Sequence, residues 1–153
     1  MTPHDRLRAL GLDLPPPPTP VGSYVPFVFD GDRLYLSGQG PREADGFKHA
    51  GKVGAEVDVE TAYRHARLVG LNLLSVAQAA LGDLSRVRRV VKLFGMVNAT
   101  PDFREHPKVI NGCSDLFIEV FGEDGRHARS AVGMGSLPGS ITVEIEAIFS
   151  IRP

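Results

Sequence analysis

Apolar and polar residues alternate most regularly near the C-terminus, over residues 141–151. Every second side chain there is apolar, and the side chains between are polar except for Ile148. Successive side chains of a β-strand point to opposite faces, so this alternation predicts a strand with one buried and one exposed face. Glu144 and Glu146 fall on the exposed face.

Two longer segments instead repeat their apolar residues at every third or fourth position, which is typical of amphipathic helices. The first covers residues 59–81 over about six turns, with Asp58 as its N-cap and Gly82 as its stop. The second covers residues 107–121 and also ends before a glycine. A shorter helix is predicted at residues 4–11, where two leucines lie three positions apart.

Other segments carry strand and loop patterns. Residues 26–40 hold two apolar runs around an Asp-Gly pair, which is typical of a β-hairpin. Residues 86–99 are apolar and β-branched without clean alternation, which predicts a strand covered on both sides. Residues 41–55 are rich in glycine, proline and charge, so we expect a surface loop that could close on a short strand at 52–54.

The predicted order is hairpin, helix, strand, helix, strand and strand, which is an α+β arrangement. Two helices can cover only one face of such a sheet, so the face with Glu144 must meet water or another subunit. Small residues at Ala131, Gly133 and Gly135 favour a symmetric oligomer that closes on that face.

The length of 153 residues and the 42% hydrophobic content fit one domain with its own core. We expect this domain to span residues 21–153. Residues 1–20 should form the short helix followed by a proline-rich strap, because each proline ring fixes φ and disfavours the α region in the residue before it.

Charge and cysteine content limit the partners and the compartment. With 17 basic and 18 acidic residues, the net charge of −1 gives no field that would draw the chain to nucleic acid or an anionic membrane. No apolar run approaches the roughly 18 residues of a membrane span, and the N-terminus does not resemble a signal peptide. The single cysteine, Cys113, excludes an internal disulfide and suits a reducing compartment, so we expect a cytoplasmic protein. The five histidines share no metal-type spacing, so we expect no metal.

Four short segments follow one another along the chain: GSYVPF at 22–27, LYLSGQGP at 34–41, HARSAVGMGSLP at 127–138 and VEIEAIFSI at 143–151. Their order and spacing closely resemble the YjgF/YER057c/UK114 family, also called the RidA family of enamine/imine deaminases. The resemblance implies a chorismate-mutase-like α+β fold with a mixed sheet and two helices on one face. It also implies a homotrimer with clefts between its subunits.

The resemblance further implies an activity and a set of site residues. Members of the family hydrolyse reactive 2-imino or 2-enamino acids to 2-keto acids and ammonia and need no cofactor. The carboxylate-binding arginine corresponds to Arg129, and the strand glutamate corresponds to Glu144. The remaining substrate-binding positions are the cleft-lining Tyr24, the Ser37 and Gly38 turn, the helix residue Asn111, and Ala131, where many relatives have a cysteine.

The chemistry of two of these residues can be stated separately. A guanidinium offers two parallel donors to a carboxylate, so Arg129 could orient a 2-imino acid through charge-assisted hydrogen bonds. Glu144 could hold the water that attacks the imine carbon. Imines also hydrolyse spontaneously, so placement alone would give a useful acceleration.

Several alternatives stay open from sequence. Whether Arg129 and Glu144 share a sheet face depends on the register across residues 136–140, although the resemblance places both toward the cleft. Arg126 and His127 could simply mark the start of a strand, and His127 could also serve as a proton shuttle. The alternative functions are a trimeric, non-catalytic binder of small carboxylates or keto acids and an endoribonuclease, although the chain lacks the basic track that the latter needs.

Overall fold

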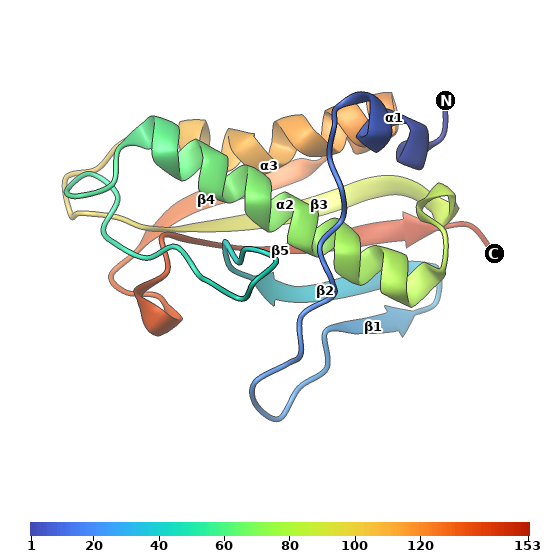
Figure 1. The fold of residues 1–153 in the computed structure, drawn as a ribbon, viewed down its shortest axis with the longest axis horizontal. Helices are drawn as coiled ribbons and strands as arrows, with labels where there is room; N and C mark the ends of the chain where they lie inside the picture. The colour runs from blue at the N-terminus through green and yellow to red at the C-terminus, as the bar shows by residue number, and fades with distance from the viewer.

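A computed structural model describes all residues, 1–153, as one five-stranded sheet with two long helices on one face (Figure 1). The strands are β1 (Phe27–Asp30), β2 (Arg33–Gln39), β3 (Val87–Asn98), β4 (Ala128–Met134) and β5 (Val143–Ile151); the helices are α1 (Pro3–Ala9), α2 (Val59–Leu81) and α3 (His106–Phe121). The sheet order is β1-β2-β5-β3-β4, and only the β3–β4 pair is parallel. The predicted α+β class with a mixed sheet is therefore confirmed.

The helix boundaries follow local signals in the sequence. The Asp58 carboxylate accepts the backbone N–H of Thr61 at 2.8 Å, which caps the first turn of α2. Gly82 ends α2 with φ of 79°, a left-handed conformation that suits glycine. The periodicity therefore predicts α2 at its observed bounds, and α3 begins one residue earlier than predicted.

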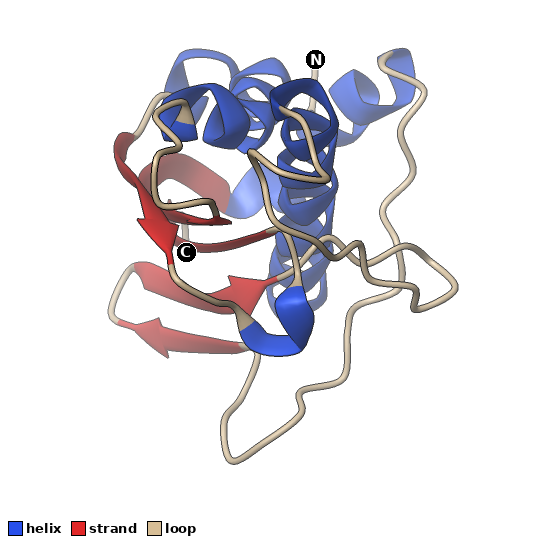
Figure 2. Cartoon of the chain, turned by 90° about the vertical axis from the view of Figure 1, so that its left-hand side faces the viewer, coloured by secondary structure: helices blue, strands red, loops and turns tan.

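The register across the sheet assigns residues to its two faces. Leu93 in β3 pairs with both Ala147 and Arg129, and the apolar Leu93 and Ala147 are buried beneath the helices. Three positions further along β3, Met96 pairs with Glu144. Because side chains alternate along a strand, Glu144 lies on the opposite face, which no helix covers. Figure 2 shows the long helices gathered on one side of the strands.

The small residues of β4 correct one expectation. Ala131 and Gly133 lie on the helix-covered face, whereas we predicted that they would face another subunit. Ala131 pairs with Gly95, where a Cβ would overlap the side chain of Ile110 in α3. Small residues are needed here because α3 packs closely on β3 and β4. Gly135 follows the end of β4, and a Cβ added there would have no atom within 4 Å.

β3 corrects a second expectation, because within the chain it is covered on one side only. Its buried residues alternate with Phe94 and Met96, which are half-exposed, while Arg88 and Arg89 are exposed. The apolar content that predicted two covered sides therefore lies partly on the open face of the sheet.

The proline-rich strap is extended and crosses α2 (Figure 1). Ser75 of α2 donates its hydroxyl to the Pro15 carbonyl at 2.5 Å, and Arg42 Nη2 donates to the Pro16 carbonyl at 2.6 Å. Leu7 of α1 is buried in the core that the helices and sheet share. These contacts hold the N-terminal segment against the body of the protein.

The loop between β2 and α2 forms isolated bridges in place of the short strand suggested at 52–54. Val53 bridges to Val57 and Ala99. Nearby, the rings of His49 and His65 stack with centroids 4.3 Å apart, and His65 Nδ1 lies 2.8 Å from Thr142 Oγ1. Burial lowers the pKa of His65 to about 4, and the charge of His49 adds to this effect.

None of the helices combines the length and the apolar character needed to cross a membrane.

Candidate functional site

Arg129 lies on the edge strand β4 and points to α3. Its Nη1 donates to Asn111 Oδ1 at 2.8 Å and to Ser114 Oγ at 3.0 Å. Its Nη2 makes a long contact of 3.5 Å with the Pro107 carbonyl. The structure thus brings together Arg129 and Asn111, two of the predicted site residues.

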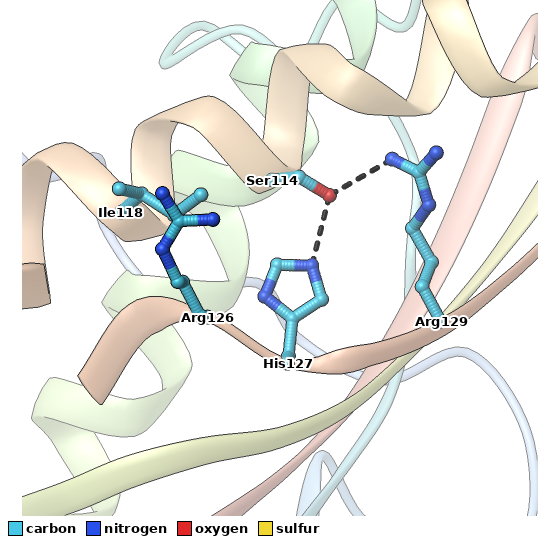
Figure 3. Close-up of a pocket in the computed structure, with 5 residues that line it drawn as sticks. All are labelled: Ser114, Ile118, Arg126, His127 and Arg129. Carbon is cyan, nitrogen blue, oxygen red and sulfur yellow. Dashed lines mark hydrogen bonds between the residues drawn. The ribbon is translucent and has the colours of Figure 1, made fainter. Parts of the chain in front are cut away.

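Ser114 connects Arg129 to His127, as Figure 3 shows. Ser114 Oγ lies 2.9 Å from His127 Nε2, and His127 Nδ1 lies 2.6 Å from the carbonyl oxygen of Gly125. Burial lowers the pKa of His127, and the charge of Arg129 adds to this effect, while the Gly125 hydrogen bond opposes it. The lowered pKa favours a neutral imidazole at neutral pH.

A pocket of about 180 Å³ opens beside these residues. Ser114, Ile118, Arg126, His127 and Arg129 line it, and no acidic side chain does. Its volume is below the roughly 300–1,000 Å³ of pockets for drug-sized ligands, so it suits only a small molecule or a part of one.

One edge of the Arg129 guanidinium has donors to spare. The Nη1 donors are both taken by α3, whereas Nε has no hydrogen-bond partner in the chain and Nη2 has only the long contact with Pro107. The Nε–Nη2 edge carries two parallel N–H groups, which match the two oxygens of a carboxylate. This edge can therefore bind an anion without disturbing the bonds to α3.

Glu144 belongs to a second group of predicted residues on the open face. The β2–β5 register shifts between Leu36 and Gln39, and Gly38 in this interval lies so close to Glu144 that a Cβ there would overlap its carboxylate. Ser37 donates its hydroxyl to the Val25 carbonyl at 2.6 Å, which ties the loop before β1 to β2. Burial raises the pKa of Glu144 above its ordinary value, and the nearby charge of Glu146 adds to this.

Tyr24 lies in the loop that Ser37 tethers and is 50% exposed. Its ring packs near Gly22 and makes no hydrogen bond within the chain, so its hydroxyl is free for an outside partner. Ser37, Gly38 and Glu144 thus form the open-face group, and Tyr24 lies in the loop tethered to it.

The predicted residues therefore form two groups within one chain. Arg129 and Asn111 lie on the side of the sheet that α3 covers, while Glu144 lies on the open face. The register that sequence left open is now defined, and it keeps Arg129 and Glu144 from facing one another in a single chain. Any site that uses both residues needs a second copy of the chain.

The side chains of Ala131 and Cys113 do not face the candidate site as possible ligand contacts or reactive groups. Ala131 packs its methyl group against the core, so only its backbone could face a ligand. Cys113 is buried beside the site, and burial raises the pKa of its thiol, so it stays protonated and unreactive. No three His, Cys, Asp or Glu side chains are grouped to hold a metal ion.

Ser114 is the residue that the sequence analysis missed. It lies three positions after Asn111, which places both on one side of α3. That spacing was a usable signal, but only the position of β4 beside α3 gives it meaning. The sequence indicates that His127 is titratable, whereas its contact with Ser114 depends on the fold.

Comparison with known proteins defines the class. Residues 4–143 match the family described as YjgF/chorismate mutase-like, putative endoribonuclease, and the chain belongs to this family. Protein TCP17 of Trypanosoma cruzi is 45% identical over 147 residues, which cover 95% of this chain and 92% of that protein.

Two solved structures show the same kinship. The crystal structure of Atu1372 from Agrobacterium tumefaciens, a protein of unknown function, is 49% identical with a TM-score of 0.91, covering 99% of this chain and 94% of that one. RidA from an Antarctic Psychrobacter species is 26% identical with a TM-score of 0.63, covering 88% of this chain and 94% of that one. The family predicted from the sequence segments is therefore confirmed.

Proposed function

We propose that this protein hydrolyses reactive 2-imino or 2-enamino acids to 2-keto acids and ammonia, without a cofactor, in clefts between the subunits of a cytoplasmic homotrimer. The observation that carries the proposal is Arg129, whose guanidinium is held by α3 on one side and keeps its Nε–Nη2 edge free. A small carboxylate is the ligand that this edge fits best. Kinship with RidA supports the choice of reaction.

Glu144 supplies the acid–base chemistry in this proposal. Water adds to the imine carbon to form a C–O bond, and its proton passes to the Glu144 carboxylate. The carboxyl gives this proton to the nitrogen, which completes a carbinolamine. The proton of the new hydroxyl then passes through the same carboxylate to the amino group, the C–N bond breaks, and ammonia leaves as the carbonyl forms. A carboxyl whose pKa is raised by burial suits this exchange because it accepts a proton more readily than an ordinary carboxylate and can also return it.

The open face of the sheet supports assembly with further copies. Besides Glu144 it carries half-exposed Phe94 and Met96 and, at the β1–β2 edge, exposed Val28 and Tyr35. Apolar side chains gathered on one uncovered face are typical of an interface between subunits. In a cyclic trimer, the Arg129 group of one copy would meet the Glu144 group of the next.

A non-catalytic binder of keto acids is the second candidate. It is favoured by the separation of the two groups, because within one chain Arg129 has a carboxylate-binding edge but no acidic partner beside it. Endoribonuclease activity appears in the family's description. We do not expect it here because the net charge of −1 gives little attraction to a phosphate backbone.

The test generates 2-imino acids in place with an amino-acid oxidase and traps the unhydrolysed imine with semicarbazide. Wild-type protein should lower the fraction of imine that is trapped. In Arg129→Ala the rate of imine hydrolysis should fall by about 10- to 100-fold, as expected when a charge-assisted pair is lost. Arg8→Ala on α1, an exposed arginine that pairs with Asp5, is the matched control and should behave as wild type.

Each result has a distinct meaning. If the imine lifetime is unchanged while keto acids bind in an Arg129-dependent way, the protein is the non-catalytic binder. If neither hydrolysis nor binding depends on Arg129, both candidates are wrong. Cleavage of single-stranded RNA that depends on this chain would instead favour the endoribonuclease.

A further inference from the structure

We propose that Ser114 and His127 are positioning residues that hold the Arg129 guanidinium in its carboxylate-binding orientation. This inference rests on the proposed carboxylate site at Arg129, and it assigns a role to two residues outside the set predicted from sequence. It is carried by a continuous chain of hydrogen bonds from the Gly125 backbone to the guanidinium.

The chemistry of the groups sets the direction of every bond in this chain. A backbone carbonyl only accepts, so His127 Nδ1 must carry the hydrogen that faces Gly125. In the neutral ring, Nε2 is then an acceptor, and Ser114 must donate its hydroxyl hydrogen to it. The Ser114 oxygen is thereby turned with its lone pairs toward Arg129 Nη1. While His127 stays neutral, none of these hydrogen bonds can exchange its donor and its acceptor.

Burial makes the arrangement rigid. Ser114 is only 7% exposed, and His127 is half-buried with its ring edge-on to Phe117 at 6.4 Å between centroids. His127 also directly precedes β4, so the ring is tied to the same strand that carries Arg129. A long arginine side chain loses considerable rotamer freedom when it binds a ligand. Holding it in advance lowers that entropic cost and strengthens carboxylate binding.

Asn111 completes the arrangement on the same side of the guanidinium. Together Asn111 and Ser114 take both hydrogens of Nη1 and so direct the free Nε–Nη2 edge away from themselves. Without Ser114, Nη1 keeps one partner and the guanidinium can turn about its terminal bonds. His127 acts one step further away, because it fixes the hydroxyl rotor of Ser114.

The test measures how variants bind pyruvate and hydrolyse the corresponding imine. Ser114→Ala should raise both the Kd for pyruvate and the KM by about tenfold and leave kcat within about twofold, because the lost interaction acts equally on ground state and transition state. His127→Phe keeps the ring but no hydrogen bond, and it should raise the same constants by about fivefold. His127→Gln retains an amide acceptor and donor and should restore values to within about twofold of wild type.

Matched controls separate positioning from general damage. Ser85→Ala changes a serine in the short 3-10 helix before β3. His4→Phe removes a half-buried histidine on α1 that forms a hydrogen bond with Gln78 of α2. Both should leave KM and kcat unchanged. Pyruvamide, which lacks the carboxylate, should bind wild type and Ser114→Ala equally weakly. If Ser114 had only a structural role, Ser114→Ala would weaken the binding of both pyruvate and pyruvamide.

The outcomes distinguish this inference from the proposed function. If pyruvate binding weakens in Ser114→Ala and His127→Phe although wild type hydrolyses no imine, the positioning role stands and the deaminase proposal fails. If hydrolysis depends on Arg129 while Ser114→Ala and His127→Phe keep wild-type Kd and KM, the positioning role is wrong. A fall in kcat with unchanged KM in these variants would also overturn it.

Discussion

Replacing Gly38 by alanine tests whether the position of the Glu144 carboxylate matters for catalysis. A methyl group at Gly38 would overlap that carboxylate, and the three atoms nearest to it would all belong to the Glu144 side chain. Gly38 does not have a left-handed backbone conformation, so alanine adds no backbone strain. The main change required is a shift of the flexible Glu144 side chain, largest at its carboxylate.

The structure therefore predicts that Gly38→Ala has a small effect on stability and a large effect on activity. Moving a half-exposed carboxylate should change the free energy of unfolding by less than about 1 kcal/mol. Displacing an acid–base group by about 1 Å from the reacting atoms, in contrast, costs on the order of 100-fold in rate. We expect Gly38→Ala to lower kcat for imine hydrolysis by about 10- to 100-fold with nearly wild-type stability.

The assay combines urea unfolding with the semicarbazide trap. Gly135→Ala is the matched control, because a Cβ at Gly135 meets nothing within 4 Å and its φ is not left-handed. Wild-type kcat in Gly38→Ala would refute the argument that Glu144 must be held beside Gly38. A large loss of stability would show that the contact cannot relax as described.

Two further predictions concern the histidines. The pKa of His65 is about 4 in the folded chain, whereas an unburied histidine in the unfolded chain has its ordinary pKa of 6.5. The folded state therefore binds this proton less well than the unfolded state. Stability should therefore fall as pH drops from about 6.5 toward 4, and His65→Gln should flatten that slope in urea titrations followed by circular dichroism; an unchanged slope would contradict the role of burial. For His127, ¹⁵N NMR at neutral pH should show a neutral ring with its hydrogen on Nδ1, and a hydrogen on Nε2 would contradict the assigned bond directions.

Local signals explain why much of the fold could be predicted. The N-cap Asp58 and the stop Gly82 define α2, and both act within a few residues of the helix ends. The alternation over residues 141–151 predicts β5 in the same way, because one side of that strand packs on the core. These features depend on neighbours in sequence and need no knowledge of the rest of the chain.

The site could be predicted only in part because it depends on register and on contacts between distant segments. The turn between β4 and β5 contains left-handed residues at Gly139 and Ser140, and its geometry decides which face Glu144 occupies relative to Arg129. The same register places Ala131 under α3, against expectation. Ser114 has no recognisable motif, since its partners come from β4 and the residue before it.

A mixing experiment tests the central claim, that Arg129 of one copy and Glu144 of another form one site. Arg129→Ala and Glu144→Ala should each be inactive alone as homo-oligomers. In trimers formed by co-refolding equal amounts, about one quarter of the clefts would combine an intact Arg129 with an intact Glu144. We expect recovery of roughly one quarter of wild-type imine hydrolysis, and no recovery from trimers shown to be mixed would contradict a site shared between two copies.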